Sequence, residues 1–384
     1  MTRVRCRFPC LGVSAPRHVI DLTGVALLLI TALVVPCRVV AQDTAESAPA
    51  PSDSTERKKL VAAPLIFSAP AFGNGLGAMG MYFYEPKGAG EESPPSTVTM
   101  VGAYSDTDSY FVGIFNQNHL RNDHLRPRVG YANGRINNNF DIPTLGDVKF
   151  SSQINGLFGR LDWRWRGDIF LGAKAGYVDV RYEPKNAAAE EYFELFDVTD
   201  NASGQFGFLL SYDSRDHTRF PTSGVLSEIS LDFVPEWLGS EEGYYVGQMS
   251  ANKYFEQKPG HIWALRAYGR LTPEGTPYVG LSTLGQRSDL RGYTAGEKVA
   301  ENLISTQAEY RWMFKPKWGV VGFAGVATLY DGAIRNINSD NTYFSGGVGL
   351  RYVLHEENRV NFRVDFAWGE DDDSGYYVSM MEAF

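Results

Sequence analysis

Cysteine is scarce in this 384-residue chain. Its three cysteines, Cys6, Cys10 and Cys37, all lie near the start. The rest of the sequence carries no thiol, which excludes a disulfide framework, a cysteine-ligated zinc site and a thiol nucleophile there. A chain without thiols suits passage through an oxidising compartment such as the bacterial periplasm.

Long hydrophobic runs are missing as well. The apolar run from Val25 to Val35 has eleven residues, whereas a membrane-spanning helix needs about twenty. After residue 60 there is no stretch of eighteen or more apolar residues and no sustained apolar spacing of three and four. Transmembrane helices and helical bundles are therefore disfavoured.

The short apolar run instead has the features of an export signal, residues 1–41. Arginines precede it, and Val39-Val40-Ala41 supplies modest side chains where a signal peptidase reads, so we expect cleavage after Ala41. A lipoprotein signal would use Cys37, but Pro36 stands where a small residue is wanted. Residues 42–59 consist largely of Ala, Pro, Ser and charged residues and are predicted to form a disordered tether.

Basic residues are fewer than acidic ones, 36 against 45. The formal net charge is −9, and loss of residues 1–41, with five arginines and one aspartate, lowers it to −13. A nucleic-acid partner is therefore not expected. Solvated loops explain an acidic balance of this kind.

What the sequence does contain, after residue 60, is alternation of apolar and polar residues. In Arg359–Trp368 every second residue from Val360 onward is apolar, and the residues between them are mostly polar. The pattern recurs in Gln205–Asp213 and in Leu303–Met313, where Ser305, Gln307, Glu309 and Arg311 form the polar face. Alternation with a period of two is typical of a β-strand with one apolar face.

The lengths of these segments distinguish a membrane barrel from a soluble sandwich. Soluble strands average about five or six residues, whereas roughly nine to eleven tilted residues are needed to cross a bilayer. The alternating segments here run to roughly ten to fourteen residues, which favours transmembrane strands. Aromatic pairs near segment ends, such as Trp163 with Trp165 and Tyr376 with Tyr377, are typical of interfacial girdles.

Sixteen such segments can be counted from residue 60 to 384. Their centres fall near residues 65, 79, 100, 113, 130, 157, 174, 207, 228, 249, 266, 308, 324, 348, 363 and 379. An even number is what a closed bacterial barrel needs, so we predict an all-β, antiparallel, sixteen-stranded transmembrane barrel.

Connector lengths support this count. In the sixteen-strand register the long connectors, 183–200, 273–300 and 331–341, all fall at the end opposite to the short ones. The short connectors are 166–168, 256–260, 315–318 and 355–358. The connector at 86–95 breaks the rule.

No arrangement for catalysis, metal binding or cofactor binding stands out. His217 lies in a charged segment that Pro221 and Gly224 close with turn chemistry, so we interpret it as part of a turn. The histidines after residue 41 lack metal-ligand spacing, and no Gly-x-Ser-x-Gly or P-loop motif occurs. The glycines from Gly73 to Gly80 precede no helix and indicate strand bends. We expect no enzymatic activity and no cofactor.

Two motifs carry a family resemblance. The first is Leu290-Arg291-Gly292-Tyr293, which lies in the longest connector. The second is a turn formed by Asp213, Arg215 and Asp216 followed by Pro221 and Gly224. Together they resemble the BamA/TamA-like outer-membrane assembly superfamily, also called the bacterial surface antigen family. Gly346–Tyr352 and Arg363-Val364-Asp365 are similar to its glycine-rich and Arg-x-Asp strands, and the final Phe384, with Tyr376, Val378 and Met380, is similar to an outer-membrane C-terminal signal.

The resemblance implies that the Leu290–Tyr293 loop folds back into the barrel, where Arg291 contacts an acidic residue of the inner wall. Glu309 is the expected partner because it lies on the polar face of its strand, and Asp365 is the reserve. Two features depart from the family: residues 42–59 cannot encode a periplasmic POTRA domain, and Gly325 stands where an acidic residue is expected.

The expected function follows from the resemblance. It is insertion or translocation of proteins or lipids at the bacterial outer membrane, with outer-membrane lipid and client proteins or lipids as partners. A passive channel for small solutes is the alternative, and an outer-membrane hydrolase is the third reading. The plugging loop favours the first, because an open porin needs a free lumen.

Overall fold

The computed structural model describes residues 59–69, 73–91, 93–142, 144–285, 290–294, 296–370 and 373–384. The predicted signal peptide, residues 1–41, and all of the predicted tether except Lys59 lie outside the described residues.

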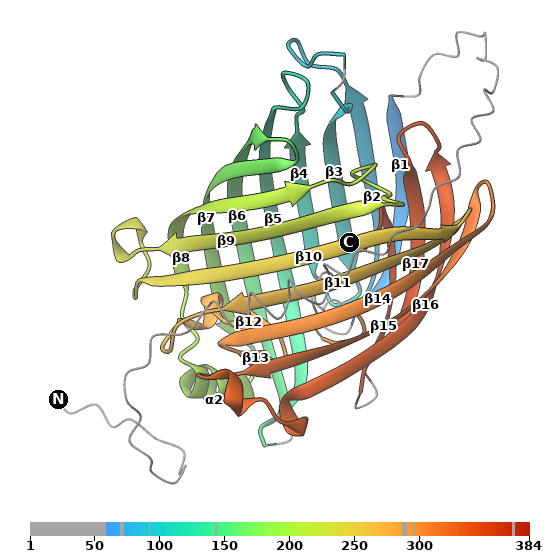
Figure 1. Ribbon diagram of the computed structural model, residues 1–384. Helices are drawn as coiled ribbons and strands as arrows, with labels where there is room; N and C mark the ends of the chain where they lie inside the picture. Colours follow the sequence, from blue (N-terminus) through green and yellow to red (C-terminus); the bar gives the residue numbers. More distant parts are fainter. Residues whose placement is uncertain are drawn as a thin grey trace. The chain divides into compact units, whose positions relative to one another are not determined.

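The described residues form a closed barrel of sixteen antiparallel strands, in which neighbours along the chain pair and β1 meets β18 (Figure 1). The barrel strands are β1 (Leu60–Ala69), β2 (Gly73–Tyr84), β3 (Ser96–Ser105), β4 (Tyr110–Gln117), β5 (Leu125–Ile142), β6 (Gly146–Arg166), β7 (Ile169–Pro184), β8 (Asn201–Asp213), β9 (Gly224–Val234), β10 (Tyr244–Lys258), β11 (His261–Leu271), β14 (Asn302–Lys315), β15 (Trp318–Tyr330), β16 (Thr342–His355), β17 (Val360–Trp368) and β18 (Ser374–Met380). Each of the sixteen predicted centres lies inside one of these strands, so the predicted fold is confirmed.

The alternation of the sequence sets which side chains face the lumen. In β14 the polar face predicted from the sequence is buried inside the barrel, whereas Thr306 and Trp312 between those residues are exposed. In β8 the outward side chains are apolar: Phe208, Leu210 and Tyr212 are all exposed. An apolar outer surface and a polar interior are the arrangement of a membrane barrel.

The two ends of the barrel differ in their connectors. Residues 167–168, 259–260, 316–317 and 356–359 make short turns at one end, here called the short-turn end. The long connectors 185–200, 272–301 and 331–341 lie at the other, the long-loop end. Within 272–301, β12 (Ser282–Thr283) and β13 (Val299–Ala300) pair as a small separate sheet. The connector 85–95, the exception noted from the sequence, does lie at the short-turn end, where Arg121 and Asn122 donate to its backbone at 2.8 and 2.7 Å.

Alternation does not predict α2 (Ala187–Phe196), which lies in the first long connector. The Asn186 side chain caps the helix by accepting from the Ala189 backbone at 3.0 Å. Tyr192 then packs with Phe140, Val148 and Phe150 of β5 and β6. No helix among the described residues has the length and apolar character needed to cross a membrane.

The closure between β1 and β18, here called the seam, is the weakest pairing in the barrel. β1 pairs with β2 at ten positions, but with β18 only at Ser68 and Tyr376 among the described residues. At the short-turn end, lumen-facing Val61 and Met81 pack against Val360 and Met380. The start of β17 and the end of β18 therefore pack against the lumen-facing side of β1 and β2. Apolar packing replaces backbone pairing there.

Candidate functional site in the barrel lumen

The Leu290–Tyr293 motif lies inside the barrel, against the inner wall of β14 to β16. Leu290 and Tyr293 are buried with Leu303, Ala327 and Leu329 in one apolar cluster. Residues 286–289 and 295 lie outside the described residues, so the segment described as the lumen loop is Leu290–Thr294. The structure therefore shows the loop folded back into the barrel, as the resemblance implies.

Polar contacts fix the backbone of the lumen loop. The Tyr293 hydroxyl donates to the Phe344 carbonyl at 2.5 Å and accepts from the Glu370 backbone at 3.1 Å. The Gly292 N–H donates to the Tyr377 hydroxyl at 3.1 Å. Gly292 has φ of 101°, and a Cβ there would lie 2.9 Å from Gly369 N, so only glycine fits.

Gly325 makes room for this loop. A Cβ at Gly325 would lie 2.7 Å from Leu290 Cδ1 and 2.9 Å from the Thr306 carbonyl. The acidic residue that the family pattern places here would therefore collide with the loop as it is packed in this chain. The glycine that replaces the expected acidic residue at position 325 thus leaves space for the Leu290 side chain.

Replacing Gly325 by alanine is expected to cost about 1–3 kcal/mol, because overpacking forces Leu290 or the strand to shift. Gly322→Ala is the matched control: it lies in the same strand, and a Cβ there meets nothing within 4 Å. The measurement is urea unfolding of the detergent-folded barrel combined with limited proteolysis of the connector 272–301. Equal stability and equal cleavage of the two variants would contradict the packing of Leu290 on β15.

Arg291 joins the loop to the wall. Its guanidinium contacts Glu309 at 2.8 Å and Asp365 at 2.6 Å, and lies 3.5 Å above the centre of the Phe323 ring. Glu309 was the expected partner and Asp365 the reserve; the structure places Arg291 between the two. Two charge-assisted hydrogen bonds and a stacked ring hold the planar guanidinium in one orientation.

These three residues belong to a larger buried cluster, here called the lumen ion network. Glu309 also accepts from Arg311 at 2.7 Å, and Asp365 accepts from Arg351 at 2.5 Å. Glu382 accepts from Arg351 at 2.8 Å. The members are Arg291, Arg311, Arg351, Arg363, Glu309, Asp365 and Glu382, and each side chain is at most 2% exposed. Four guanidinium groups thus face three side-chain carboxylates, so these carboxylates are the scarce partners.

The C-terminal residues enter the lumen, which alternation from β18 does not predict. Met381 has φ of 68° and turns the chain inward. Glu382 then accepts from Asn361 at 2.9 Å, and the Phe384 carbonyl accepts from Arg311 at 3.1 Å. The four residues named as an outer-membrane signal are therefore divided: Tyr376 packs outside on Phe366, Val378 borders the lumen, Met380 is buried at the seam and Phe384 lies inside. Their role as a recognition signal stays a prediction.

The turn motif lies at the short-turn end, in the connector 214–223. Asp213 accepts from Arg126 and Arg215, both at 2.8 Å. Asp216 accepts from the backbone of Thr222 at 2.8 Å and from Arg359, in the turn between β16 and β17, at 2.6 Å. Gly224 has φ of 99°, and Pro221 is buried in the same connector. Asp213, at the end of β8, thus contacts the start of β5, and Asp216 in the connector contacts the turn between β16 and β17.

His217 has the turn role predicted from the sequence. Burial, together with the nearby Arg219, lowers the pKa of His217 to about 4. The neutral ring accepts from the Arg219 backbone at 3.2 Å through Nδ1. Among the described residues no group of three or more His, Cys, Asp or Glu side chains could hold a metal ion.

Several members of the site escaped the sequence reasoning. Arg311 was placed on the inner face of its strand without a partner, and Arg351 lay inside the glycine-rich motif without a role. Glu382 lies within the C-terminal pattern of Tyr376 to Phe384, which assigns it no role. Excess arginine at inward positions of β14, β16 and β17 is the signal that could have found them, because buried guanidinium groups need carboxylates.

The fold and site define a class: a membrane β-barrel with a loop held in its lumen by a buried ion network. Residues 138–384 match the Omp85 superfamily domain. The chain therefore belongs to the Omp85 superfamily, which agrees with the resemblance drawn from its motifs. The described residues 59–384 hold the barrel and no POTRA domain.

Solved structures share the fold. BamA from Haemophilus ducreyi lacking POTRA domains 1–3 is 13% identical with a TM-score of 0.53. The match covers 85% of this chain and 70% of the BamA chain. CdiB from Escherichia coli is 12% identical with a TM-score of 0.60, covering 85% of this chain and 63% of CdiB. CdiB from Acinetobacter baumannii is 10% identical with a TM-score of 0.54, covering 84% and 60%. This chain thus spans less than two thirds of the two CdiB chains. No curated protein matches it.

Proposed function

We propose that this protein resides in the bacterial outer membrane and inserts or translocates proteins or lipids there by opening its barrel at the seam. The observation that carries the proposal is the single backbone pair between β1 and β18 among the described residues. In the lipid-exposed part of a membrane every backbone group needs a partner, so a barrel normally has no open edge. A seam with almost no pairing is the place where separation costs least.

The rest of the lumen supports this assignment. The lumen loop contacts Phe344 of β16, Asp365 of β17 and Tyr377 of β18, next to the seam. The ion network thereby stiffens the wall from β14 to β18 while β1 stays weakly attached. Opening would therefore move β1 and β2 away from a fixed wall. The proposal needs no covalent chemistry and no cofactor.

A passive channel is the second candidate. The observation that favours it is a cavity of about 1280 Å³ in the lumen, whose lining includes no residue of the lumen loop. A channel of this kind would conduct without any separation of β1 from β18, so locking the seam distinguishes the two functions.

A disulfide across the seam tests the proposal. Ser68→Cys with Tyr376→Cys joins the one register pair, and the three natural cysteines all lie in the signal that is expected to be cleaved. Ala62→Cys with Gly80→Cys is the control, because it locks β1 to β2, which are already paired. Facing residues of antiparallel strands lie about 4.5–5.5 Å apart at Cα, within the reach of a disulfide.

The readouts in reconstituted vesicles are insertion of an unfolded outer-membrane barrel and transbilayer movement of a fluorescent phospholipid. We expect at least one to exceed that of empty vesicles, to be lost on oxidation of the seam pair and to return on reduction. Equal inhibition by the control pair, or no activity above empty vesicles, would overturn the proposal. Solute flux that the seam disulfide leaves unchanged would support the passive channel instead.

A further inference from the structure

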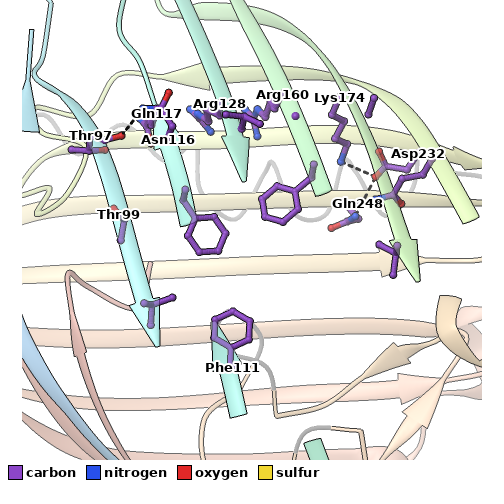
Figure 2. Close-up of a pocket in the computed structure, with 18 of the residues that line it drawn as sticks. Thr97, Thr99, Phe111, Asn116, Gln117, Arg128, Arg160, Lys174, Asp232 and Gln248 are labelled. Atoms are coloured by element: carbon purple, nitrogen blue, oxygen red, sulfur yellow. Dashed lines mark hydrogen bonds and ion pairs between the residues drawn. The ribbon is translucent and has the colours of Figure 1, made fainter. Parts of the chain in front are cut away.

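The lumen contains a cavity of about 1280 Å³ with two unlike walls. Ligand cavities in proteins usually measure about 300–1,000 Å³, so this one has room for a sizeable organic molecule. Figure 2 shows a row of basic side chains, Arg128, Arg160 and Lys174, along one level of the cavity, with Phe111 farther along the barrel.

The first wall is apolar, which is unusual for the inside of a barrel. Barrel interiors are polar, and an exposed apolar patch on a protein surface marks a binding site. Here Phe158 faces the lumen yet is 42% exposed. The apolar lining side chains of β1 to β4 and β6 are Leu65, Met79, Met81, Val101, Ala103, Phe111, Phe115 and Phe158.

Part of this wall has a structural role. A Cβ at Gly130 would meet the rings of Phe115 and Phe158, so these two rings cover the glycine. Val101 and Phe111 lie beside two other glycines, 3.2 and 3.4 Å from a Cβ built at Gly113 and Gly134, and together with Met79 they line the cavity in the same region. The apolar surface is therefore larger than the packing of Gly130 requires.

The second wall carries more positive charge than its carboxylates neutralise. Seven described cations line the cavity: Arg126, Arg128, Arg160, Lys174, Arg215, Arg219 and Arg270. Four of them have close carboxylate partners, supplied by Asp123, Asp162, Asp213, Glu228 and Asp232. Seven cations thus face five carboxylates, in a chain whose overall charge is −9.

Arg128 is the cation most available to a ligand. It lies 3.5 Å from Asp162, which Arg160 already engages at 2.8 and 3.0 Å. The Arg128 Nε is buried and has no hydrogen-bond partner within the described part of the chain. Among the described residues, Arg270 and Arg219 donate only to uncharged oxygens, Arg270 to Gly280 and Ser282 and Arg219 to Pro95.

The strand register places the two chemistries side by side. Gln117, Arg128 and Arg160 are register partners across β4, β5 and β6. Phe115, Gly130 and Phe158 form the next inward row of the same strands, toward the long-loop end. A molecule with an anionic group at the first row and an apolar chain along the second would satisfy both walls.

The cavity also borders the seam. Leu65 and Met79 of the first two strands, and Val378, Ser379 and Met381 at the end of the chain, line it. The apolar wall is therefore continuous with the place where the barrel is least paired. An apolar chain entering from the bilayer through the seam would stay in contact with apolar side chains.

We propose that this cavity binds an anionic lipid, with the phosphate of its head group at Arg128 and its acyl chain along Phe111 and Met79. This proposal rests on the proposed function and narrows its substrates from proteins or lipids to anionic lipids. Guanidinium groups suit phosphate because their planar fork makes two parallel hydrogen bonds.

Photolabelling of the full chain in phosphatidylcholine nanodiscs tests the proposal. The probe is a small fraction of phosphatidylglycerol with a photoreactive acyl chain, and adducts are mapped by peptide mass spectrometry. We expect labelling on lumen-facing residues of β2 to β6. Arg128→Gln should lower it about tenfold, the loss of one charge-assisted hydrogen bond. Phe111→Gln should also lower it, by removing part of the acyl contact.

The matched control is Arg181→Gln, which removes the same charge from a side chain that is 68% exposed. It should leave labelling unchanged, and a heat-modified gel shift must show that every variant is folded. Equal labelling by a phosphatidylcholine probe, or labelling that Arg128→Gln leaves intact, would overturn the proposal. Competition by free glycerol phosphate as strong as that by phosphatidylglycerol would also overturn it, because the site would then read the head group alone.

The outcome is separable from that of the proposed function. Labelling in the cavity without any insertion or lipid movement in vesicles would leave the binding site standing and overturn the transport role. Transport that the seam disulfide blocks, without labelling, would overturn the lipid site alone.

Discussion

Replacing Glu309 by glutamine is expected to lower the free energy of unfolding of the barrel by about 3–5 kcal/mol, as for other buried pairs that lose one partner. Glu309 lies 2.8 Å from Arg291, 2.7 Å from Arg311 and 3.8 Å from Arg351. The variant would leave four buried guanidinium groups with two side-chain carboxylates. Urea unfolding of the detergent-folded barrel, followed by gel mobility without boiling, measures the loss.

Arg291→Ala should have a different effect. It leaves Glu309 with Arg311 and Asp365 with Arg351, so each carboxylate of the wall keeps a cation while the loop loses its anchor over Phe323. We expect faster proteolysis of the connector 272–301, higher conductance and a smaller loss of barrel stability than with Glu309→Gln. The double variant should be little less stable than Glu309→Gln alone, because residues in one network are not additive.

Ser305→Ala is the control for this series. Ser305 lies on the same inward face of β14, and its hydroxyl is buried without a hydrogen-bond partner among the described residues. Loss of the hydroxyl should change the free energy of unfolding by less than about 0.5 kcal/mol, because it removes no hydrogen bond or ion pair. If Arg291→Ala destabilises the barrel as much as Glu309→Gln does, the charge imbalance is not what governs the network.

Met100→Arg is expected to cost about 2–4 kcal/mol, the range for arginine on the lipid face near the bilayer midplane. Met100 lies in the middle of β3 and is 58% exposed on the outer surface. Thr99→Arg is the adjacent control, because Thr99 lines the lumen cavity, where a cation stays hydrated. Unfolding of both variants in phospholipid vesicles gives the comparison. Equal losses of unfolding free energy at the two positions would mean that Met100 does not face the bilayer.

The strands could be predicted from the sequence because facing is a local property. A period of two fixes which side of β14 or β8 meets lipid, whatever the neighbouring strands contain. The lumen loop could be placed inside because its motif resembles that of a known family. Without that resemblance, the same residues are a short connector segment in which Leu290 and Tyr293 stand beside a charged residue and a glycine.

The ion network could be predicted only in part, because it depends on pairing across strands. Glu309 and Asp365 lie on strands that are not neighbours, and Arg291 and Arg351 each contact both of them. Glu382 reaches Arg351 through the reversal at Met381, where the positive φ of a non-glycine residue leaves no signal in the sequence. The seam is equally hidden, since β1 and β18 alternate as other strands do. Its weakness lies in the number of backbone pairs that the closed barrel can form.

Hydrogen exchange of the backbone amides, measured by mass spectrometry on the folded barrel in nanodiscs, tests the opening seam most directly. The amides of β1 and β18 are expected to exchange fastest among the barrel strands, while those of β14 to β16, which the lumen ion network holds, stay protected. Protection of β1 and β18 equal to that of β15 would show a seam that stays shut and would contradict opening at this place.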